Sequence, residues 1–298
     1  MQKTSSDVTH SVILPGLAVF GTVLTWAASF PAIGYALREI EPLPLASVRF
    51  AMAAILAGLL LAWRRPRMLS LRDNGVVLIC GVLGIALYNV LLNSGQTTVS
   101  AGAASFIVNT QPLFMAVFAV FFLKETFSRW SWLGAALSFA GVAIIGSGQP
   151  GGFSFGAGSS LIIAAAACAA AYSVLQRPLF TRAAPMDITA FVLITGALAL
   201  LPWLASGLNQ AMNARPDTLF AVTFLAIAPA LIGQTCWTYA LKSFGAARAG
   251  QFLYLIPPAS VLLAWFLLGE APQWCTLAGG VLALSGVLIV NTWGRAKA

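Results

Sequence analysis

Long apolar runs, separated by short polar segments, dominate the chain. The runs cover approximately residues 12–36, 43–63, 75–95, 101–123, 130–147, 157–176, 188–205, 218–240, 247–268 and 274–293. Each is close to the ~20 residues that an α-helix needs to cross ~30 Å of hydrocarbon. Strands of a membrane barrel would alternate apolar and polar residues over ~10 positions, and these runs do not alternate. The pattern predicts an all-α integral membrane protein with ten transmembrane helices.

The composition supports a membrane location. Of the 298 residues, 59% are hydrophobic and only 8% are charged, whereas a soluble domain carries about 25% charged residues. The polar start of the chain precedes a first run that is too long for a cleavable signal peptide, so we expect a retained helix. A lipid bilayer is therefore the expected main partner.

The basic residues are distributed unevenly between the polar segments. With the amino terminus in the cytoplasm, 13 of the 16 Lys and Arg residues lie in inside segments, Arg38 and Arg215 lie outside, and Arg49 lies within the second run. Cytoplasmic loops of membrane proteins carry this excess of positive charge. The distribution predicts a bacterial cytoplasmic (inner) membrane protein with both termini in the cytoplasm. It also explains the net charge of +8 without nucleic acid as a partner.

The sequence repeats itself at an offset of 145 residues. Residues 101–145 and 246–290 share twelve identical positions, including Pro112/Pro257, Glu125/Glu270, Gly134/Gly279 and Gly141/Gly286. We therefore expect two five-helix repeats, residues 1–148 and 149–298. Because five is odd, the second repeat should be inverted in the membrane. Inverted repeats are common in transporters that work by alternating access, and their substrate site lies near the midplane.

These motifs resemble a known family. The pattern Pro112…Leu123-Lys124-Glu125…Gly134…Gly141, its copy in the second half, Trp26 and the Arg49-Phe50 pair resemble the EamA-type repeat of the drug/metabolite transporter superfamily. Within the superfamily the chain is similar to YddG-type exporters. The resemblance implies export of aromatic or hydrophobic amino acids, or of similar small metabolites.

Polar and aromatic residues within the runs are candidates for a substrate site, because such residues tend to face a bundle interior. On a helix of ~100° per residue, Tyr88, Asn89 and Asn93 share one face, as do Ser105 and Asn109. Amides and aromatic rings suit a zwitterion with an apolar side chain. The alternative is that they join helices or form interfacial belts. The predicted substrate-binding set is Trp26, Tyr88, Asn89, Asn93, Ser105, Asn109, Tyr172, Gln234, Trp237 and Tyr254.

Proline and charge add three further expectations. Pro112 and Pro257 interrupt helix hydrogen bonding at matching positions, so we expect paired hinges, the alternative being static kinks. Arg49 could hold a substrate carboxylate, but its place near the outer end of its run favours snorkelling or bonding to carbonyls at a helix end. Glu125 and Glu270 are expected to cap or bond to neighbouring loops.

The residues that are missing narrow the function. No Asp or Glu lies at the middle of a run, and the first run lacks the Glu on which small multidrug exporters of this superfamily depend. This favours a facilitator with weak or absent ion coupling. No catalytic cluster or metal-ligand spacing occurs, so we expect neither an enzyme nor a cofactor. An exporter of amphiphilic cations and a channel-like pore remain alternatives, and a monomer would suffice.

Overall fold

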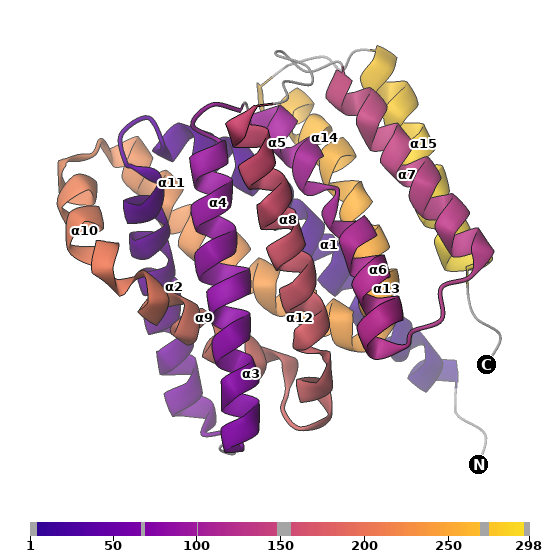
Figure 1. Ribbon diagram of the computed structural model, residues 1–298, viewed down its shortest axis with the longest axis horizontal. Helices are drawn as coiled ribbons and strands as arrows, with labels where there is room; N and C mark the ends of the chain where they lie inside the picture. The colour runs from indigo at the N-terminus through magenta and orange to yellow at the C-terminus, as the bar shows by residue number, and fades with distance from the viewer. Residues whose placement is uncertain (1–4, 67–68, 100, 148–155, 269–273, 295–298) are drawn as a thin grey trace.

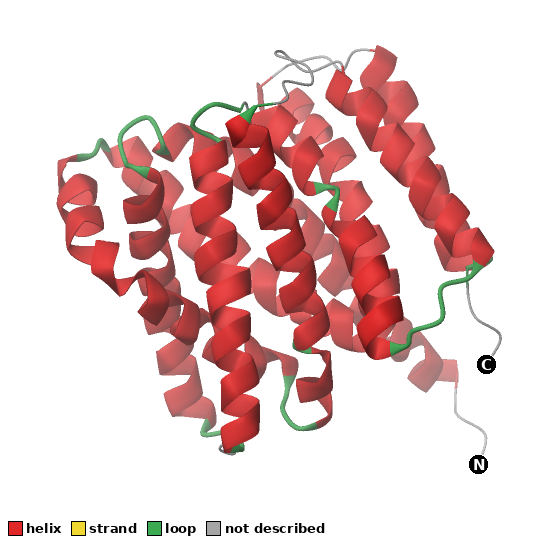
Figure 2. Cartoon of the chain, in the orientation of Figure 1, coloured by secondary structure: helices red, strands yellow, loops and turns green. Residues whose placement is uncertain are grey.

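Every regular element of the computed structural model is a helix. It describes residues 5–66, 69–99, 101–147, 156–268 and 274–294, and no strand occurs among them (Figure 2). The all-α prediction is therefore confirmed. The expected boundary between residues 148 and 149, and Glu270, lie outside the described residues.

The helices follow one another with short connections (Figure 1). The first half contains α1 (Ser5–Ala36), α2 (Pro42–Arg64), α3 (Leu71–Gly81), the π-helix η1 (Val82–Leu87), α4 (Tyr88–Gly95), α5 (Ala101–Val108), α6 (Gln111–Leu123) and α7 (Arg129–Ser147). The second half contains α8 (Ala157–Leu175), the 3-10 helix η2 (Arg177–Thr181), α9 (Pro185–Leu200), the 3-10 helix η3 (Leu201–Trp203), α10 (Leu204–Asn213), α11 (Pro216–Ile227), the π-helix η4 (Ala228–Gly233), α12 (Gln234–Phe244), α13 (Ala246–Gln251), the 3-10 helix η5 (Phe252–Leu255), α14 (Ile256–Leu268) and α15 (Trp274–Thr292).

Seven helical stretches within the described residues are long and apolar enough to cross a membrane. They are Ile13–Ala36, Pro42–Arg64, Leu71–Gly95, Ala103–Leu123, Ala157–Thr181, Pro185–Asn213 and Pro216–Phe244. The remaining three apolar runs are also helical, as α7, α13 to α14, and α15. The chain is thus a multi-pass, all-helical protein.

The element boundaries recur at the offset found in the sequence. The pair α7 and α15 are both 19 residues long and start 145 residues apart. The same offset relates α6 to α14, each of 13 residues. The six-residue π-helices η1 and η4 start 146 residues apart. The repeat in sequence is therefore also a repeat of backbone features, including an uncommon one.

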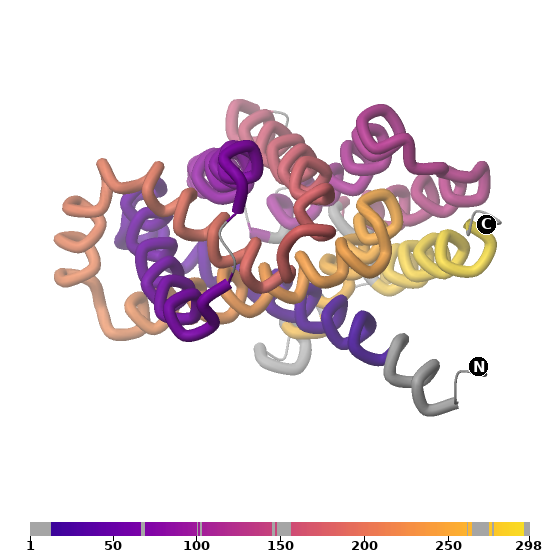
Figure 3. The backbone as a smooth tube through the Cα atoms, turned by 90° about the horizontal axis from the view of Figure 1, so that it is seen from below, coloured from indigo at the N-terminus to yellow at the C-terminus, as the bar shows by residue number. Residues whose placement is uncertain are grey.

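Close packing of small residues joins α7 and α15, which lie side by side in two perpendicular views (Figures 1 and 3). Gly134 lies against Gly286, and Gly141 lies against Gly279. A Cβ on Gly134 would lie 2.6 Å from the Gly286 carbonyl oxygen, so the backbones approach too closely for a larger side chain. Such contacts are typical of membrane helix pairs. Because one residue number rises as its partner's falls, the two helices are antiparallel.

Ion pairs hold the ends of the bundle together. Glu39, after α1, pairs with Arg215, before α11. At the opposite ends of the helices, the pairs are Arg64–Asp187, Arg182–Asp73 and Arg177–Glu125. All four of these pairs, found among the described residues, involve residues at or near helix termini, whereas the buried Arg49 takes part in none of them.

Candidate functional site

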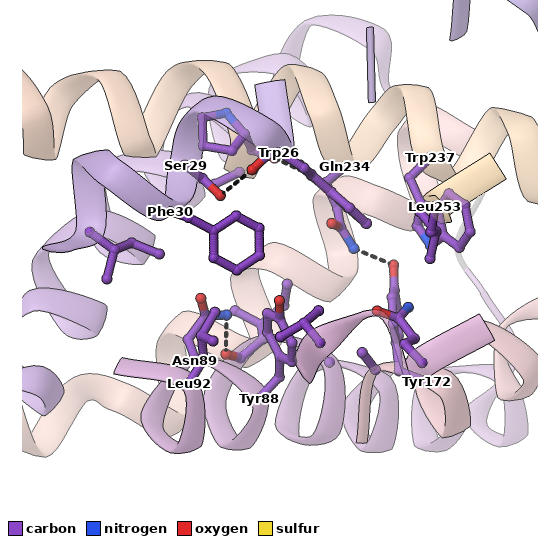
Figure 4. Close-up of a pocket in the computed structure, with 18 of the residues that line it drawn as sticks. Trp26, Ser29, Phe30, Tyr88, Asn89, Leu92, Tyr172, Gln234, Trp237 and Leu253 are labelled. Atoms are coloured by element: carbon purple, nitrogen blue, oxygen red, sulfur yellow. Dashed lines mark hydrogen bonds between the residues drawn. The ribbon is translucent and has the colours of Figure 1, made fainter. Parts of the chain in front are cut away.

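A cavity lies in the middle of the bundle, between helices from both halves (Figure 4). Its volume is about 60 Å³. A single water needs ~10–15 Å³ by this kind of measure, so the cavity has room for only a few waters. Its wall consists of Trp26, Ser29, Phe30, Ile33, Arg49, Phe50, Gly84, Ile85, Tyr88, Asn89, Leu92, Val108, Asn109, Gln111, Ala169, Tyr172, Ser173, Pro229, Ala230, Gln234, Trp237, Leu253 and Ile256.

Aromatic rings form one side of the cavity. The indoles of Trp26 and Trp237 lie 5.5 Å apart between ring centroids, tilted by 48°. Trp26 Nε1 donates to the carbonyl of Pro229 at 3.2 Å, and Trp237 Nε1 donates to Ser173 Oγ at 3.3 Å. Because both indole N–H groups already have acceptors, the rings are fixed and offer the cavity apolar area.

A phenol, that of Tyr172, lies beside these rings, and its ring contacts the other half of the chain. The amide of Gln234 donates to Tyr172 Oη at 2.6 Å, linking α12 to α8, as Figure 4 shows. The ring of Tyr172 packs directly on η1, where a Cβ on Gly84 would lie 2.3 Å from Tyr172 Cγ. Because glycine has no Cβ, residue 84 leaves the space in which this ring lies.

Among the described residues that line the cavity, Arg49 alone carries a charge. It is 6% exposed. Its Nε donates to the carbonyl of Leu225 at 3.1 Å, and its Nη1 donates to Asn89 Oδ1 at 3.2 Å. The Leu225 carbonyl is free to accept because residue i+4 is Pro229, which has no N–H. Bonding to a carbonyl, one of the two expected roles, is thus present, but snorkelling to the surface is not: the guanidinium is buried at the cavity.

The two π-helices position the residues on opposite walls. In η1, Tyr88 N bonds back to the carbonyl of Leu83, and in η4, Gln234 N bonds back to that of Pro229. Each π-turn ends where a pair of cavity residues begins, Tyr88 with Asn89 in one span, and Gln234 with Trp237 in the other. Single π-turns within α-helices often mark functional sites.

Most of the predicted substrate-binding residues meet at this cavity. Seven of the ten line it: Trp26, Tyr88, Asn89, Asn109, Tyr172, Gln234 and Trp237. Their polar or aromatic character within apolar runs indicated them, and Asn89, Asn109 and Trp237 also lie near the middle of a run on a shared helix face. Their role in binding a substrate stays a prediction.

Three predicted residues lie elsewhere. Asn93 is four residues beyond Asn89, about 6 Å along the axis, and its Nδ2 donates to the carbonyl of Pro42 at 3.0 Å, near the start of α2. Ser105 is buried and its carbonyl accepts from Asn109 Nδ2 at 2.6 Å. Helix faces give the direction of a side chain but not its depth along the bundle, which explains both differences.

Tyr254 lies in a second apolar cluster, away from the cavity. It packs with Phe106, Val142, Ala283 and Val287. Its repeat partner Asn109 does line the cavity. The local backbones differ: the break around Asn109 begins only after α5 ends at Val108, whereas Tyr254 lies inside the four-residue 3-10 helix η5, which begins at Phe252. Equivalent positions in the sequence repeat therefore place the side chains of Asn109 and Tyr254 in different surroundings.

The expected hinge prolines occupy equivalent breaks in two spans. Pro112 lies in the first turn of α6, just after the interruption at Asn109 and Thr110. Pro257 lies in the first turn of α14, just after η5. Proline is tolerated in a first turn because its missing N–H has no helical acceptor there. The breaks are present; movement about them stays a prediction.

Several lining residues were outside the predicted set. Gly84, Pro229 and Gln111 had local signals: a glycine and a proline inside apolar runs, and an amide next to Pro112. Ser173 follows Tyr172 on α8 and had no comparable signal. For Arg49, the short distance to the end of its run favours snorkelling or carbonyl bonding over a carboxylate partner, and the structure places it at the cavity.

The carboxylate of Glu125 has a structural role, as expected. It accepts from the backbone N–H groups of Ala246 at 3.1 Å and Ala247 at 3.0 Å, at the start of α13, and pairs with Arg177 at 3.4 Å. A larger hollow of about 620 Å³ lies beside it. Within the part of the chain that the structure describes, no three His, Cys, Asp or Glu side chains gather into a metal site.

These features define a multi-pass helical membrane protein with a central cavity between two related halves. The sequence profile described as the EamA-like transporter family matches the chain twice, at residues 14–147 and 156–292. The chain belongs to this family. It is therefore a transporter and not an enzyme.

Individual relatives agree with this membership. A probable terminal-alkyne amino-acid exporter of Streptantibioticus cattleyicolor is 32% identical over 286 residues, covering 93% of each chain. The uncharacterized transporter YdfC of Bacillus subtilis is 33% identical over 266 residues, covering 88% of this chain and 86% of YdfC. A solved crystal structure of a protein with 21% sequence identity has a TM-score of 0.75 and covers 94% of this chain and 97% of that one, which supports the fold.

Proposed function

We propose that the protein exports amino acids with aromatic or hydrophobic side chains, or similar small metabolites, from the cytoplasm. The observation that carries this proposal is the composition of the central cavity, where two fixed indoles face a wall of amides and a buried guanidinium. Aromatic area suits an apolar side chain, and the polar wall suits charged ends. The similarity to an amino-acid exporter points the same way.

The proposed topology is ten transmembrane helices in two inverted repeats. Antiparallel packing of α7 and α15 supports inversion, because each is the last helix of its repeat. The reciprocal glycine contacts, 134 with 286 and 141 with 279, are those of a two-fold axis between copies. With the positive-inside distribution, this topology puts both termini in the cytoplasm and the protein in the bacterial inner membrane.

The proposed mechanism is alternating access by a monomer. The cavity, at about 60 Å³, is far below the ~300–1,000 Å³ typical of ligand pockets. Helices must therefore separate before a substrate enters. The paired breaks before Pro112 and Pro257 are the proposed hinges, one in each half.

Weak or absent ion coupling completes the proposal. Among the described residues that line the cavity, none is Asp or Glu, and a proton-coupled carrier usually needs such a group. The same feature argues against amphiphilic cations as substrates, because the cavity offers them a cation, Arg49, and no buried acid.

Transport into liposomes tests the proposal. Liposomes that contain the purified protein should take up labelled aromatic amino acids faster than liposomes without it. This flux should saturate with concentration and show counterflow. Flux that rises linearly without counterflow would favour a pore instead. A protonophore should leave the flux unchanged, and a collapse of flux would contradict the uncoupled mechanism. Absence of flux for every amino acid tested would reject the export proposal itself.

A further inference from the structure

Arg49 has unused hydrogen-bonding capacity at the cavity. A guanidinium carries five N–H donors, and two of those of Arg49 donate to the Leu225 carbonyl and to Asn89 Oδ1. The other three have no partner among the described residues. Arg49 takes part in none of the four ion pairs among these residues, which involve Arg64, Arg177, Arg182 and Arg215. Arg49 is thus a buried cation with neutral partners only.

Such an arrangement favours an anionic ligand. Burying a charge is costly unless it is paired, and the Leu225 carbonyl and the Asn89 amide supply no charge. The guanidinium carbon lies 4.8 Å from the centroid of the Phe50 ring, which covers one face of the group. The unused donors lie in the guanidinium plane, where a carboxylate binds through two parallel hydrogen bonds.

Asn109 offers the complementary group. Its side chain is 2% exposed, and its Nδ2 donates to the Ser105 carbonyl at 2.6 Å. Its Oδ1 is buried and has no partner among the described residues. An acceptor left unpaired in the interior is unfavourable. An ammonium group, with three N–H donors, is the natural partner for this oxygen.

We propose that Arg49 is the residue that makes the cavity selective for solutes with a free carboxylate, while Asn109 Oδ1 receives the ammonium group of the same solute. This inference rests on the proposed export of amino acids and specifies which groups of the substrate are recognised. It follows that an amino acid binds better than its amide, which has no carboxylate. A carboxylic acid without the amino group uses Arg49 alone.

Binding of phenylalanine, phenylalaninamide and 3-phenylpropionate to the purified protein tests the proposal. Intrinsic tryptophan fluorescence reports binding, because Trp26 and Trp237 lie in the cavity wall. The wild type should prefer phenylalanine over phenylalaninamide by about tenfold or more, as expected for hydrogen bonds to a charged group. Arg49→Gln should reduce this preference to about twofold or less. Arg49→Lys, which keeps the charge without the planar fork, should be intermediate.

Asn109→Ala tests the proposed contact with the ammonium group of the solute. It should weaken phenylalanine binding several-fold and leave 3-phenylpropionate unchanged. An Arg49→Gln or Arg49→Lys protein that keeps the full preference for phenylalanine over its amide overturns the proposal. If Arg49→Gln does not fold, as judged by gel filtration, the Arg49→Lys result decides.

The liposome assay separates this proposal from the export proposal. Saturable amino-acid flux with a carboxylate preference that does not depend on Arg49 leaves export standing and rejects the role of Arg49. Arg49-dependent binding of phenylalanine without any flux supports the site and rejects export.

Discussion

The two π-helices are the same backbone feature used in two different ways. Both η1 and η4 are six residues long and interrupt the third span of their half. In η4, Pro229 frees the Leu225 carbonyl for Arg49, and its own carbonyl accepts from Trp26. In η1 there is no proline, and Gly84 instead admits the Tyr172 ring. A repeated backbone thus supports two unlike walls, as the proposed amino-acid substrate, with its unlike ends, would require.

The largest effect is expected from a larger side chain at Gly84 of η1, where Tyr172 leaves no space for a Cβ. Gly84→Ala would put a Cβ 2.3 Å from Tyr172 Cγ, far below the 3.4 Å of ordinary contact. The ring must move, and its hydrogen bond from Gln234 should break. We expect a loss of about 1–3 kcal/mol of stability from overpacking and at least about a tenfold loss of flux. Thermal unfolding and liposome transport measure the two effects.

Gly58→Ala is the matched control for this change. Gly58 lies in α2, where a Cβ would have no neighbour within 4 Å. The substitution should keep full transport and, because alanine favours helix, raise stability slightly. If Gly84→Ala behaved like Gly58→Ala, the close contact between η1 and Tyr172 would have no functional importance.

The same contrast shows which features the sequence could reveal. Apolar runs predicted the helices, and the offset of 145 predicted that α7 and α15 would be equivalent, because both depend on pattern alone. The neighbours of Asn93, Tyr254 and Arg49 depend on depth along the bundle and on 3-10 or π turns. A periodicity of ~100° per residue assumes a regular helix, so it fails where the backbone departs from one.

The next effect concerns the aromatic wall beyond η4. Trp237→Ala removes the ring that packs 5.5 Å from Trp26 and leaves Ser173 Oγ without its indole donor. Aromatic pairs contribute about 0.5–1.5 kcal/mol beyond area burial. The ratio of phenylalanine to alanine flux should therefore fall about three- to tenfold. Trp237→Phe keeps a ring and should preserve most of the ratio. An unchanged ratio in Trp237→Ala would remove this wall from the substrate site.

A smaller effect is expected from a substitution that adds a backbone N–H donor at position 229 of η4. Pro229→Ala restores an N–H that can bond to the Leu225 carbonyl, in competition with Arg49 Nε at 3.1 Å. The carbonyl that accepts from Trp26 is retained, so the aromatic wall should stay in place. We expect the KM for amino acids to rise about two- to fivefold, as for a single weakened hydrogen bond. Pro202→Ala, in the exposed helix η3, should leave KM unchanged, and equal effects at both prolines would contradict this view.

The smallest effect concerns how the two π-bearing spans are anchored at their starts. Asp73 of α3 pairs with Arg182, whereas Arg215, before α11, pairs with Glu39, so acid and base have changed places. Hydrogen bonding from the Arg215 backbone N–H, at 2.9 Å, lowers the pKa of Glu39 below its ordinary value of 4.5. A lowered pKa in the folded state means that stability is present above the ordinary value and is lost as the pH falls through the folded value.

Thermal unfolding of wild type and Glu39→Gln between pH 7 and pH 3 measures this contribution. The wild type should be slightly more stable at pH 7, and the difference should shrink as the pH falls through the lowered pKa of Glu39 in the folded state. The carboxylate lies near the surface, with 21% of its side chain exposed, against 7% for Asp73. Asp73→Asn should therefore destabilise the protein more than Glu39→Gln, because its ion pair is better shielded from water. The reverse order would mean that the span containing η4 depends on its anchor more than the span containing η1 does.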